Sequence, residues 1–301
     1  MSADTIKHDH SDPHAIPTPA RGLASLAWRK FRRHKLALTG SIVLLVIAFV
    51  SYGAPLLTGY DPNAIDILAR NQTPSLAHWL GTDGTGRDIL TRLFYAGRVS
   101  LTVAIMAVAL AALIGITIGS LSGYYGHAVD TVLMRFTDTI MSMPMVIIAI
   151  ALVAVLGPSL RNVIILFGIL GWPPMARVVR GQFLSYREAV FVEASQALGA
   201  TDRRIILSHI LPNSIGAIVV TSTFDAGRAI LLEAGLSFLG LGVQPPTASW
   251  GNMINTAQTV TIIQSYPWLW LPAGLMIVAT VLCLNFVGDG LRDALDPRMQ
   301  T

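Results

Sequence analysis

The stretch LALTGSIVLLVIAFVSYGAPLL, residues Leu36–Leu57, contains 22 residues and no charged side chain. A helix of this length is roughly 33 Å long, which is enough to cross the hydrocarbon core of a bilayer. The composition of the whole chain agrees, since 53% of the 301 residues are hydrophobic, only 13% are charged and the mean hydropathy is +0.59. Soluble domains carry about 25% charged residues. The sequence therefore predicts an all-α integral membrane protein.

Five further apolar segments predict additional spans, for six transmembrane helices in total. They are Ser100–Tyr125, Ile140–Leu156, Asn162–Ala176, Ile215–Leu241 and Leu269–Val287. The sequence GWPP at residues 171–174 predicts a break in the fourth span. In the second span, Gly115, Gly119 and Gly123 recur every four residues, which favours close contact with a neighbouring helix.

The distribution of basic residues predicts that both termini lie in the cytoplasm. Five basic residues directly precede the first span: Arg29, Lys30, Arg32, Arg33 and Lys35. Cytoplasmic loops carry an excess of Lys and Arg, and six spans return the C-terminus to the starting side. The loop at Val243–Tyr266, which this topology places outside, has no Lys or Arg. The long segment after the first span carries four arginines, but long segments translocate largely regardless of charge.

The resulting organisation has five parts. Residues 1–35 form a cytoplasmic tail and a basic approach helix able to reach anionic lipid headgroups. The tail contains His8, His10 and His14 without any pattern that fixes metal geometry, so no metal site is predicted. Residues 36–57 form the first transmembrane helix, 58–98 an extracytoplasmic segment, 99–290 the main transmembrane domain with a cytoplasmic loop at 180–213, and 291–301 a second cytoplasmic tail.

Within the extracytoplasmic segment, the sequence LGTDGTGRDILTRLFYAGR, Leu80–Arg98, is rich in glycine. It lacks the G-x-x-x-x-G-K-[ST] pattern of a phosphate-binding loop. We expect instead a helix that starts near Gly86, with Thr85 as its N-cap and an ion pair between Asp88 and Arg92 at i,i+4. This segment is predicted to be structural.

The cytoplasmic loop contains VEASQALGATDRRIILSHILPNS, Val192–Ser214. Its pattern predicts one helix over about Gln182–Leu198, ended by Gly199 as a C-cap glycine. A second helix, capped by Thr201 or Asp202, is expected to stop at Pro212. Residues around the break are small, which suits docking against another surface. An amphipathic pair lying on the bilayer remains the alternative.

Three charged residues interrupt the fifth span: Asp225, Arg228 and Glu233. Charges inside a membrane usually face a cavity or a partner. Asp225 and Arg228 lie at i,i+3 and can form an ion pair, while Glu233 lies eight residues from Asp225, near the same helical face. A structural ion pair and a translocation path for a peptide are both compatible with this pattern.

The sequence EASQALGATDRRIILSHILP resembles the EAA loop of binding-protein-dependent ABC importer permeases. Glu193, Ala194, Gly199, Leu211 and Pro212 fall on that pattern, whereas Ser195 and His209 depart from it. Three further stretches, LGTDGTGRDILTRL, EAGLSFLGLGVQPPTASWGNMI and NFVGDGLRDALDP, are similar to the dipeptide and oligopeptide permease C-type subunits.

This resemblance implies a six-helix type I ABC importer permease of the MetI-like fold in the bacterial inner membrane. It implies a second permease subunit, two ATP-binding subunits and an extracytoplasmic solute-binding protein as partners, with ATP and Mg bound by the ATPases and no cofactor or nucleic acid bound by this chain. The coupling residues would be Glu193, Ala194, Ser195, Leu198, Gly199, Ala200 and Asp202, and Asp225, Arg228 and Glu233 would line the pathway.

Di- and oligopeptides are the expected cargo, with nickel, glutathione or another small solute as alternatives. Two other classes compete with the importer. A self-contained secondary transporter would place coupling charges in several spans, but here the three charges share one span. A membrane-embedded enzyme is disfavoured because no H-E-x-x-H motif occurs and the histidines are scattered outside the tail. The single cysteine, Cys283, cannot form a disulfide within the chain.

Overall fold

The computed structural model describes residues 23–295, and within that range it is all-helical without a strand. The N-terminal tail with its three histidines and the last six residues lie outside the described residues. The α-helices are α1 (Leu23–Arg33), α2 (Lys35–Tyr52), α3 (Ala54–Leu57), α4 (Ile89–Tyr125), α5 (His127–Met141), α6 (Met145–Leu156), α7 (Leu160–Tyr186), α8 (Val190–Ala197), α9 (Asp202–Arg204), α10 (Leu211–Phe238), α11 (Trp250–Asn255), α12 (Val260–Ser265) and α13 (Leu271–Leu295). Short 3₁₀ turns occupy Ile67–Ala69, Thr256–Gln258 and Pro267–Leu269, and a π-helical turn occupies Ile205–Ile210.

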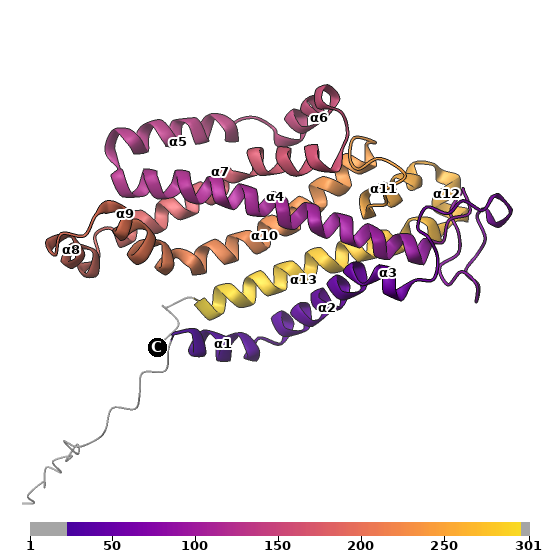
Figure 1. Cartoon of the computed structure of the whole chain (residues 1–301), viewed down its shortest axis with the longest axis horizontal. Coiled ribbons are helices and arrows are strands. Elements are labelled where there is room, and N and C mark those ends of the chain that lie inside the picture. The colour runs from indigo at the N-terminus through magenta and orange to yellow at the C-terminus, as the bar shows by residue number, and fades with distance from the viewer. Residues whose placement is uncertain (1–22, 296–301) are drawn as a thin grey trace, which may run out of the picture.

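Among residues 23–295, five continuous helical segments are long and apolar enough to cross a membrane, and counting the bent pair of α5 and α6 as one broken span gives six. The prediction of six spans is thus confirmed. Figure 1 shows these helices as an elongated bundle, with α4 and α10 running through its middle and α13 and α2 along one side. This arrangement buries apolar side chains between the long helices.

The most extensive helix pairing in the described bundle joins α4 to α7. A Cβ atom added at Gly115 would lie 2.7 Å from the Cβ of Met175, and one at Gly123 would lie 2.5 Å from the Cβ of Phe183. Gly119 meets the backbone of α7 in the same way, 2.5 Å from the carbonyl oxygen of Ala176. The four-residue glycine spacing therefore serves the close helix contact that the sequence predicted.

The third span differs from the single helix predicted over Ile140–Leu156. The chain forms α5 up to Met141 and α6 from Met145, with a bend of 78° between them. Pro144 explains the break, because proline lacks a backbone N–H and disfavours helical geometry in the residue before it. Charged residues on α5 concealed this helix in the hydropathy pattern, and two of them are paired with α7: Asp130 with Arg180 and Asp138 with Arg177.

The prediction of a helix break at GWPP, residues 171–174, is also wrong. Helix α7 runs without interruption from Leu160 to Tyr186, with Pro173 and Pro174 inside it. Trp172, Pro173 and Met175 are buried against the bundle, so packing on α4 holds the helix together despite two missing backbone hydrogen bonds. A local rule for proline was overridden by tertiary contacts.

A third correction concerns Pro212, which does not stop a helix. The chain is continuously helical over Asp202–Phe238, and Pro212 lies in the first turn of α10. The preceding π-helical turn has the Leu211 N–H donating to the Ile206 carbonyl. Because proline needs no hydrogen-bond acceptor in a first turn, this position tolerates it.

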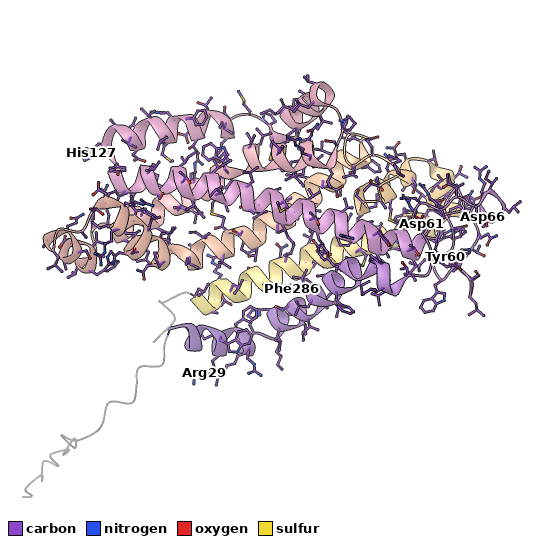
Figure 2. All side chains as sticks on the ribbon, in the orientation of Figure 1. Arg29, Tyr60, Asp61, Asp66, His127 and Phe286 are labelled. Atoms are coloured by element: carbon purple, nitrogen blue, oxygen red, sulfur yellow. The ribbon has the colours of Figure 1, made fainter. Side chains whose placement is uncertain are left out.

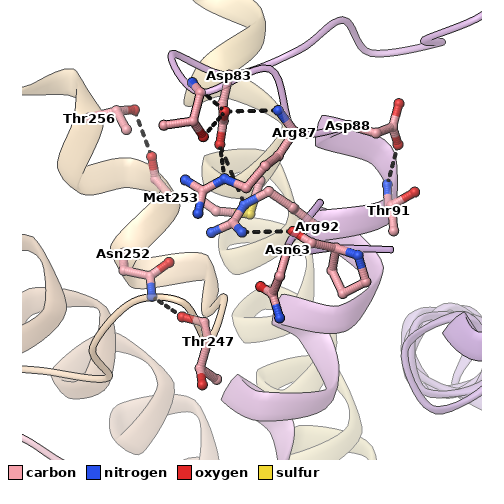
Figure 3. Close-up of polar contacts among 12 residues, drawn as sticks. Asn63, Asp83, Arg87, Asp88, Thr91, Arg92, Thr247, Asn252, Met253 and Thr256 are labelled. Carbon is pink, nitrogen blue, oxygen red and sulfur yellow. Dashed lines mark hydrogen bonds and ion pairs between the residues drawn. The ribbon is translucent and has the colours of Figure 1, made fainter. Parts of the chain in front are cut away.

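The start of α4 also differs from the prediction. Asp88, not Thr85, is the N-cap, and its Oδ1 accepts the Thr91 N–H at 2.7 Å (Figure 3). The Oδ2 of Asp88 lies 3.0 Å from Nδ1 of His78, so both carboxylate oxygens face partners other than Arg92. Arg92 consequently does not pair with Asp88. Its Nε lies 3.7 Å from Oδ2 of Asp83 instead.

The two ends of the bundle carry different segments. Figure 1 shows α8 and α9 at one end, together with the N-terminal end of α1 and the C-terminal end of α13. The other end carries α3, α11 and α12. In Figure 2, Tyr60, Asp61 and Asp66 lie at that second end and His127 lies at the first. Segments predicted to be cytoplasmic therefore gather at one end, and segments predicted to be extracytoplasmic gather at the other.

Candidate functional site

Helix α8 forms a short projecting element at the first end of the bundle, and a Schellman motif ends it. Gly199 has φ +79°, the left-handed conformation that glycine adopts without strain. The Gly199 N–H donates to the Gln196 carbonyl at 2.9 Å, and the Ala200 N–H donates to the Ser195 carbonyl at 3.0 Å. These are the two hydrogen bonds of the motif. The predicted helix end at Gly199 is confirmed, and the turn fixes the direction of the chain into α9.

The predicted helix over Gln182–Leu198 is, however, two helices. Helix α7 ends at Tyr186, three residues follow in a turn, and α8 begins at Val190. The first helix of the loop is thus a continuation of a membrane span. The separate element is only eight residues long.

One side of α8 is anchored in the bundle. Val192 is fully buried and belongs to an apolar cluster with Phe183, Ile205 and Ile210. The Tyr124 hydroxyl at the end of α4 donates to Oδ1 of Asp202 at 2.8 Å. The loop is therefore tied to α4, α7 and the π-helical turn, and it projects as a fixed element.

The other side of α8 presents apolar groups to the outside. Leu198 is 88% exposed and Val190 is 80% exposed. The predicted coupling residues are distributed around them: Glu193, Ala194, Gly199 and Asp202 are exposed, while Ser195 and Ala200 are half-buried. Large exposed apolar side chains on an anchored element are typical of an interaction surface.

A cavity of about 200 Å³ lies within the bundle, between α4, the bend joining α5 to α6, α7 and α10. We call it the methionine cavity, because Met141, Met143 and Met145 line it. Its charged lining residues are Asp225 and Arg228, and Pro173 and Pro174 of α7 complete one wall. The α5–α6 bend, which the sequence analysis did not predict, and the prolines of GWPP, which it treated only as a break, thus shape this cavity.

The expected ion pair between Asp225 and Arg228 is present, with Arg228 Nη1 donating to Asp225 Oδ1 at 3.1 Å. The two side chains differ in environment. Asp225 is 13% exposed, whereas Arg228 is 66% exposed. The carboxylate therefore belongs to the enclosed part of the cavity, and the guanidinium reaches out of it.

Glu233 is not part of this cavity, although sequence spacing placed it near the same face. Its side chain is fully buried and accepts hydrogen bonds from Ser100 Oγ (3.1 Å) and Ser237 Oγ (2.7 Å). The Ser100 hydroxyl in turn accepts the Trp250 N–H at 3.2 Å. Glu233 thus joins α4, α10 and α11 through hydroxyl groups, a role that spacing on one helix could not reveal.

The fold and these two sites define a membrane-transport subunit: a helical bundle with a charged internal cavity and an anchored helical projection at one end. The family model of binding-protein-dependent transport system inner membrane components matches residues 115–301. The model of the N-terminal transmembrane domain of oligopeptide transport permease C matches residues 22–74. Together the two matches cover all of the chain except residues 1–21 and 75–114.

Similar proteins extend over nearly the whole chain. The dipeptide transport system permease protein DppC of Alkalihalophilus pseudofirmus is 42% identical over 306 residues, covering 98% of this chain and 100% of that protein. The glutathione transport system permease protein GsiD of Pectobacterium atrosepticum is 40% identical over 275 residues, or 91% of each chain. The inward-facing MetNI methionine ABC transporter has a similar fold, with a TM-score of 0.57 at 17% identity, covering 68% of this chain and 96% of the matched chain.

The chain belongs to the family of inner-membrane components of binding-protein-dependent transport systems. It is accordingly a permease subunit of an ABC importer with a MetI-like fold.

Proposed function

We propose that this chain forms half of the translocation pathway for di- or oligopeptides, together with a second permease subunit. Relatives named for dipeptide and oligopeptide transport, each more than 40% identical, support peptides as the cargo. Glutathione, named for another relative, is itself a short peptide. The methionine cavity suits varied cargo, since thioether side chains adapt to irregular shapes.

In this proposal, α8 is the element that docks on a separate ATPase subunit. The observation that carries the proposal is the exposure of Leu198 and Val190 on an anchored helix at the end opposite the extracytoplasmic segment. ATP and Mg are bound by two ATPase subunits, and a solute-binding protein delivers the peptide from outside. We assign both termini to the cytoplasm, because the start of α1 and the end of α13 lie at the end of the bundle that carries α8 (Figure 1) and because basic residues precede α2.

The residues of the coupling surface are Glu193, Ala194, Ser195, Leu198, Gly199, Ala200 and Asp202. Asp225 and Arg228 border the pathway at the methionine cavity. Glu233 supports the pathway by holding α10 against α4 and α11.

The test compares two exposed leucines in the transporter reconstituted with its partner subunits. Leu198→Glu should abolish co-purification of the ATPase subunits and uptake of a labelled dipeptide, because it puts a charge in an apolar contact. Leu76→Glu is the matched control, since Leu76 is 98% exposed in the extracytoplasmic segment. Normal ATPase retention and normal uptake in Leu198→Glu would refute the docking role.

A further inference from the structure

A second cavity, of about 490 Å³, lies at the end of the bundle that carries α11 and α12. We call it the arginine cavity. Its lining combines charged residues of the extracytoplasmic segment, Asp83, Arg87 and Arg92, with apolar residues that include Met253, Ile262 and Leu269. Its volume falls within the range of roughly 300–1,000 Å³ found for small-molecule sites.

The carboxylate of Asp83 is fully engaged by its own turn and by Arg87 (Figure 3). Its Oδ1 accepts the Thr85 N–H at 2.8 Å, the Thr85 hydroxyl at 2.7 Å and the Arg87 N–H at 3.1 Å. Its Oδ2 accepts Nε of Arg87 at 2.7 Å. Asp83 is therefore shared between two guanidinium groups, bonded to Arg87 and 3.7 Å from Nε of Arg92, so one carboxylate faces two positive charges in the cavity.

Arg92 is that second cation, and it is 6% exposed. Nη1 donates to the Pro62 carbonyl at 2.9 Å, and Nε lies 3.7 Å from the already engaged Asp83 (Figure 3). Among residues 23–295, the remaining nitrogen, Nη2, donates to no other residue, and it is not sealed from solvent. The nearby Asp88 is turned away, bonded to His78 and Thr91. A largely buried guanidinium that shares its one nearby carboxylate with a second arginine favours a further anion.

We propose that the arginine cavity binds a short peptide by its C-terminal carboxylate, with Arg92 as the principal contact. A guanidinium presents a planar fork that matches a carboxylate, and the apolar wall of Met253, Ile262 and Leu269 can receive an aliphatic side chain. An acidic side chain of a docked protein could also pair with Arg92, but it would leave most of the apolar wall without a contact. The inference rests on the proposed peptide transport and adds to it an outer site separate from the methionine cavity.

The test uses the assembled transporter in lipid nanodiscs with the binding protein left out. Saturation-transfer NMR measures the dissociation constants of the dipeptide Ala-Leu and of its C-terminal amide, which lacks the negative charge. The free acid should bind at least about tenfold more tightly, as expected for a charge-assisted hydrogen bond. Arg92→Gln should bring the ratio close to one, and Arg92→Lys should give an intermediate ratio because it keeps the charge without the fork.

Arg98→Gln is the matched control, because Arg98 is exposed on the same helix and does not line the cavity. It should keep the wild-type ratio. If Arg92→Gln fails to assemble, the reduced ratio in Arg92→Lys carries the test. Equal binding of acid and amide by the wild type, or an unchanged ratio in Arg92→Lys, would overturn the proposal.

Two measurements separate this site from its alternatives. If the dipeptide does not bind but Arg92→Lys weakens capture of the solute-binding protein, the anion is a protein side chain and the peptide site is refuted. Uptake of Ala-Leu into proteoliposomes supplied with the binding protein tests the proposed function independently. Carboxylate-dependent binding without any uptake would refute peptide transport while leaving the site itself intact.

Discussion

The sharpest perturbation available in the proposed coupling loop, residues 180–213, is a graded series at Gly199. This residue has φ +79°, and a Cβ atom added there would meet no heavy atom within 4 Å. Substitution therefore acts through the backbone alone. A side chain in the left-handed region costs about 1–2 kcal/mol, with less cost for Asn and more for β-branched residues. The equilibrium between the observed turn and its alternatives should shift by roughly 5- to 30-fold.

Loss of this turn would break the two Schellman hydrogen bonds and release α8 from its fixed angle to α9. We expect ATP hydrolysis stimulated by the binding protein to fall least in Gly199→Asn, more in Gly199→Ala and most in Gly199→Val. The assay is phosphate release by the assembled transporter in proteoliposomes. Retention of the ATPase subunits is measured on the same preparations.

The chain offers a matched control at the end of α10. Gly240 has φ +78°, no heavy atom within 4 Å of an added Cβ, and the same two hydrogen bonds, from its own N–H to Ser237 and from Leu241 to Leu236. Gly240→Ala thus introduces the same backbone strain at the other end of the bundle. ATPase retention should remain normal in it. The reasoning would be contradicted if ATP hydrolysis in Gly199→Val were stimulated as in the wild type. It would also be contradicted if Gly240→Ala lost the ATPase subunits to the same extent as Gly199→Ala.

Three further predictions concern the charged groups and the topology. Arg228→Ala should lower the yield of assembled complex more than Asp225→Ala, because it strands the less exposed member of the pair; the reverse order by size-exclusion chromatography would refute this. Asp83 is partly buried, which opposes ionisation, but hydrogen bonds from Thr85 and Arg87 hold its pKa below the ordinary 3.8. Because its folded-state pKa is lowered, the ionised Asp83 stabilises the fold above pH 3.8, and this stabilisation is lost as the pH falls through the folded pKa. Melting curves of Asp83→Asn measured over the acid range should therefore lack this loss of stability. In a background without the native cysteine, Leu76→Cys should react with an impermeant thiol reagent added to intact cells. Leu198→Cys should react only after permeabilisation, and its labelling in intact cells would contradict the assignment of α8 to the cytoplasmic side.

Hydropathy was sufficient to predict the class and the number of spans because a bilayer imposes a length and an apolar composition on each helix. It was insufficient for α5, whose Asp130 and Asp138 make the segment look soluble. Those charges are neutralised by Arg180 and Arg177 of α7, which lie far away in the sequence. Hydropathy scores each residue alone and cannot include such a partner.

The candidate sites show the same limit. Gly199 was predictable because a left-handed helix end has a local signature in the sequence. The partners of Glu233 were not, since Ser100 lies 133 residues away. Spacing along α10 grouped Glu233 with Asp225. Tertiary packing instead places Glu233 among the serine hydroxyl groups and Asp225 at the methionine cavity. The local rule for proline failed at Pro173 because packing on α4 holds α7 together, and at Pro212 because the preceding π-helical turn leaves the proline in a first-turn position.

The continuity of the helix across Pro212 bears directly on how the coupling loop could act on the pathway. From Asp202 to Phe238 the chain is helical over 37 residues, which corresponds to roughly 56 Å. One end of this helix is bonded to α4 through Asp202 and carries the turn after α8. Further along it lie Asp225 at the methionine cavity and Glu233 beneath α11. The π-helical turn is the one break in this segment that could absorb a displacement. The rest of the helix is continuous, so movement of α8 would be transmitted to Asp225 and Glu233 together. Rigid secondary elements are one of the means by which distant sites are coupled, so the π-helical turn at Ile205–Ile210 is the place in this segment where a local change should uncouple the loop from the cavity.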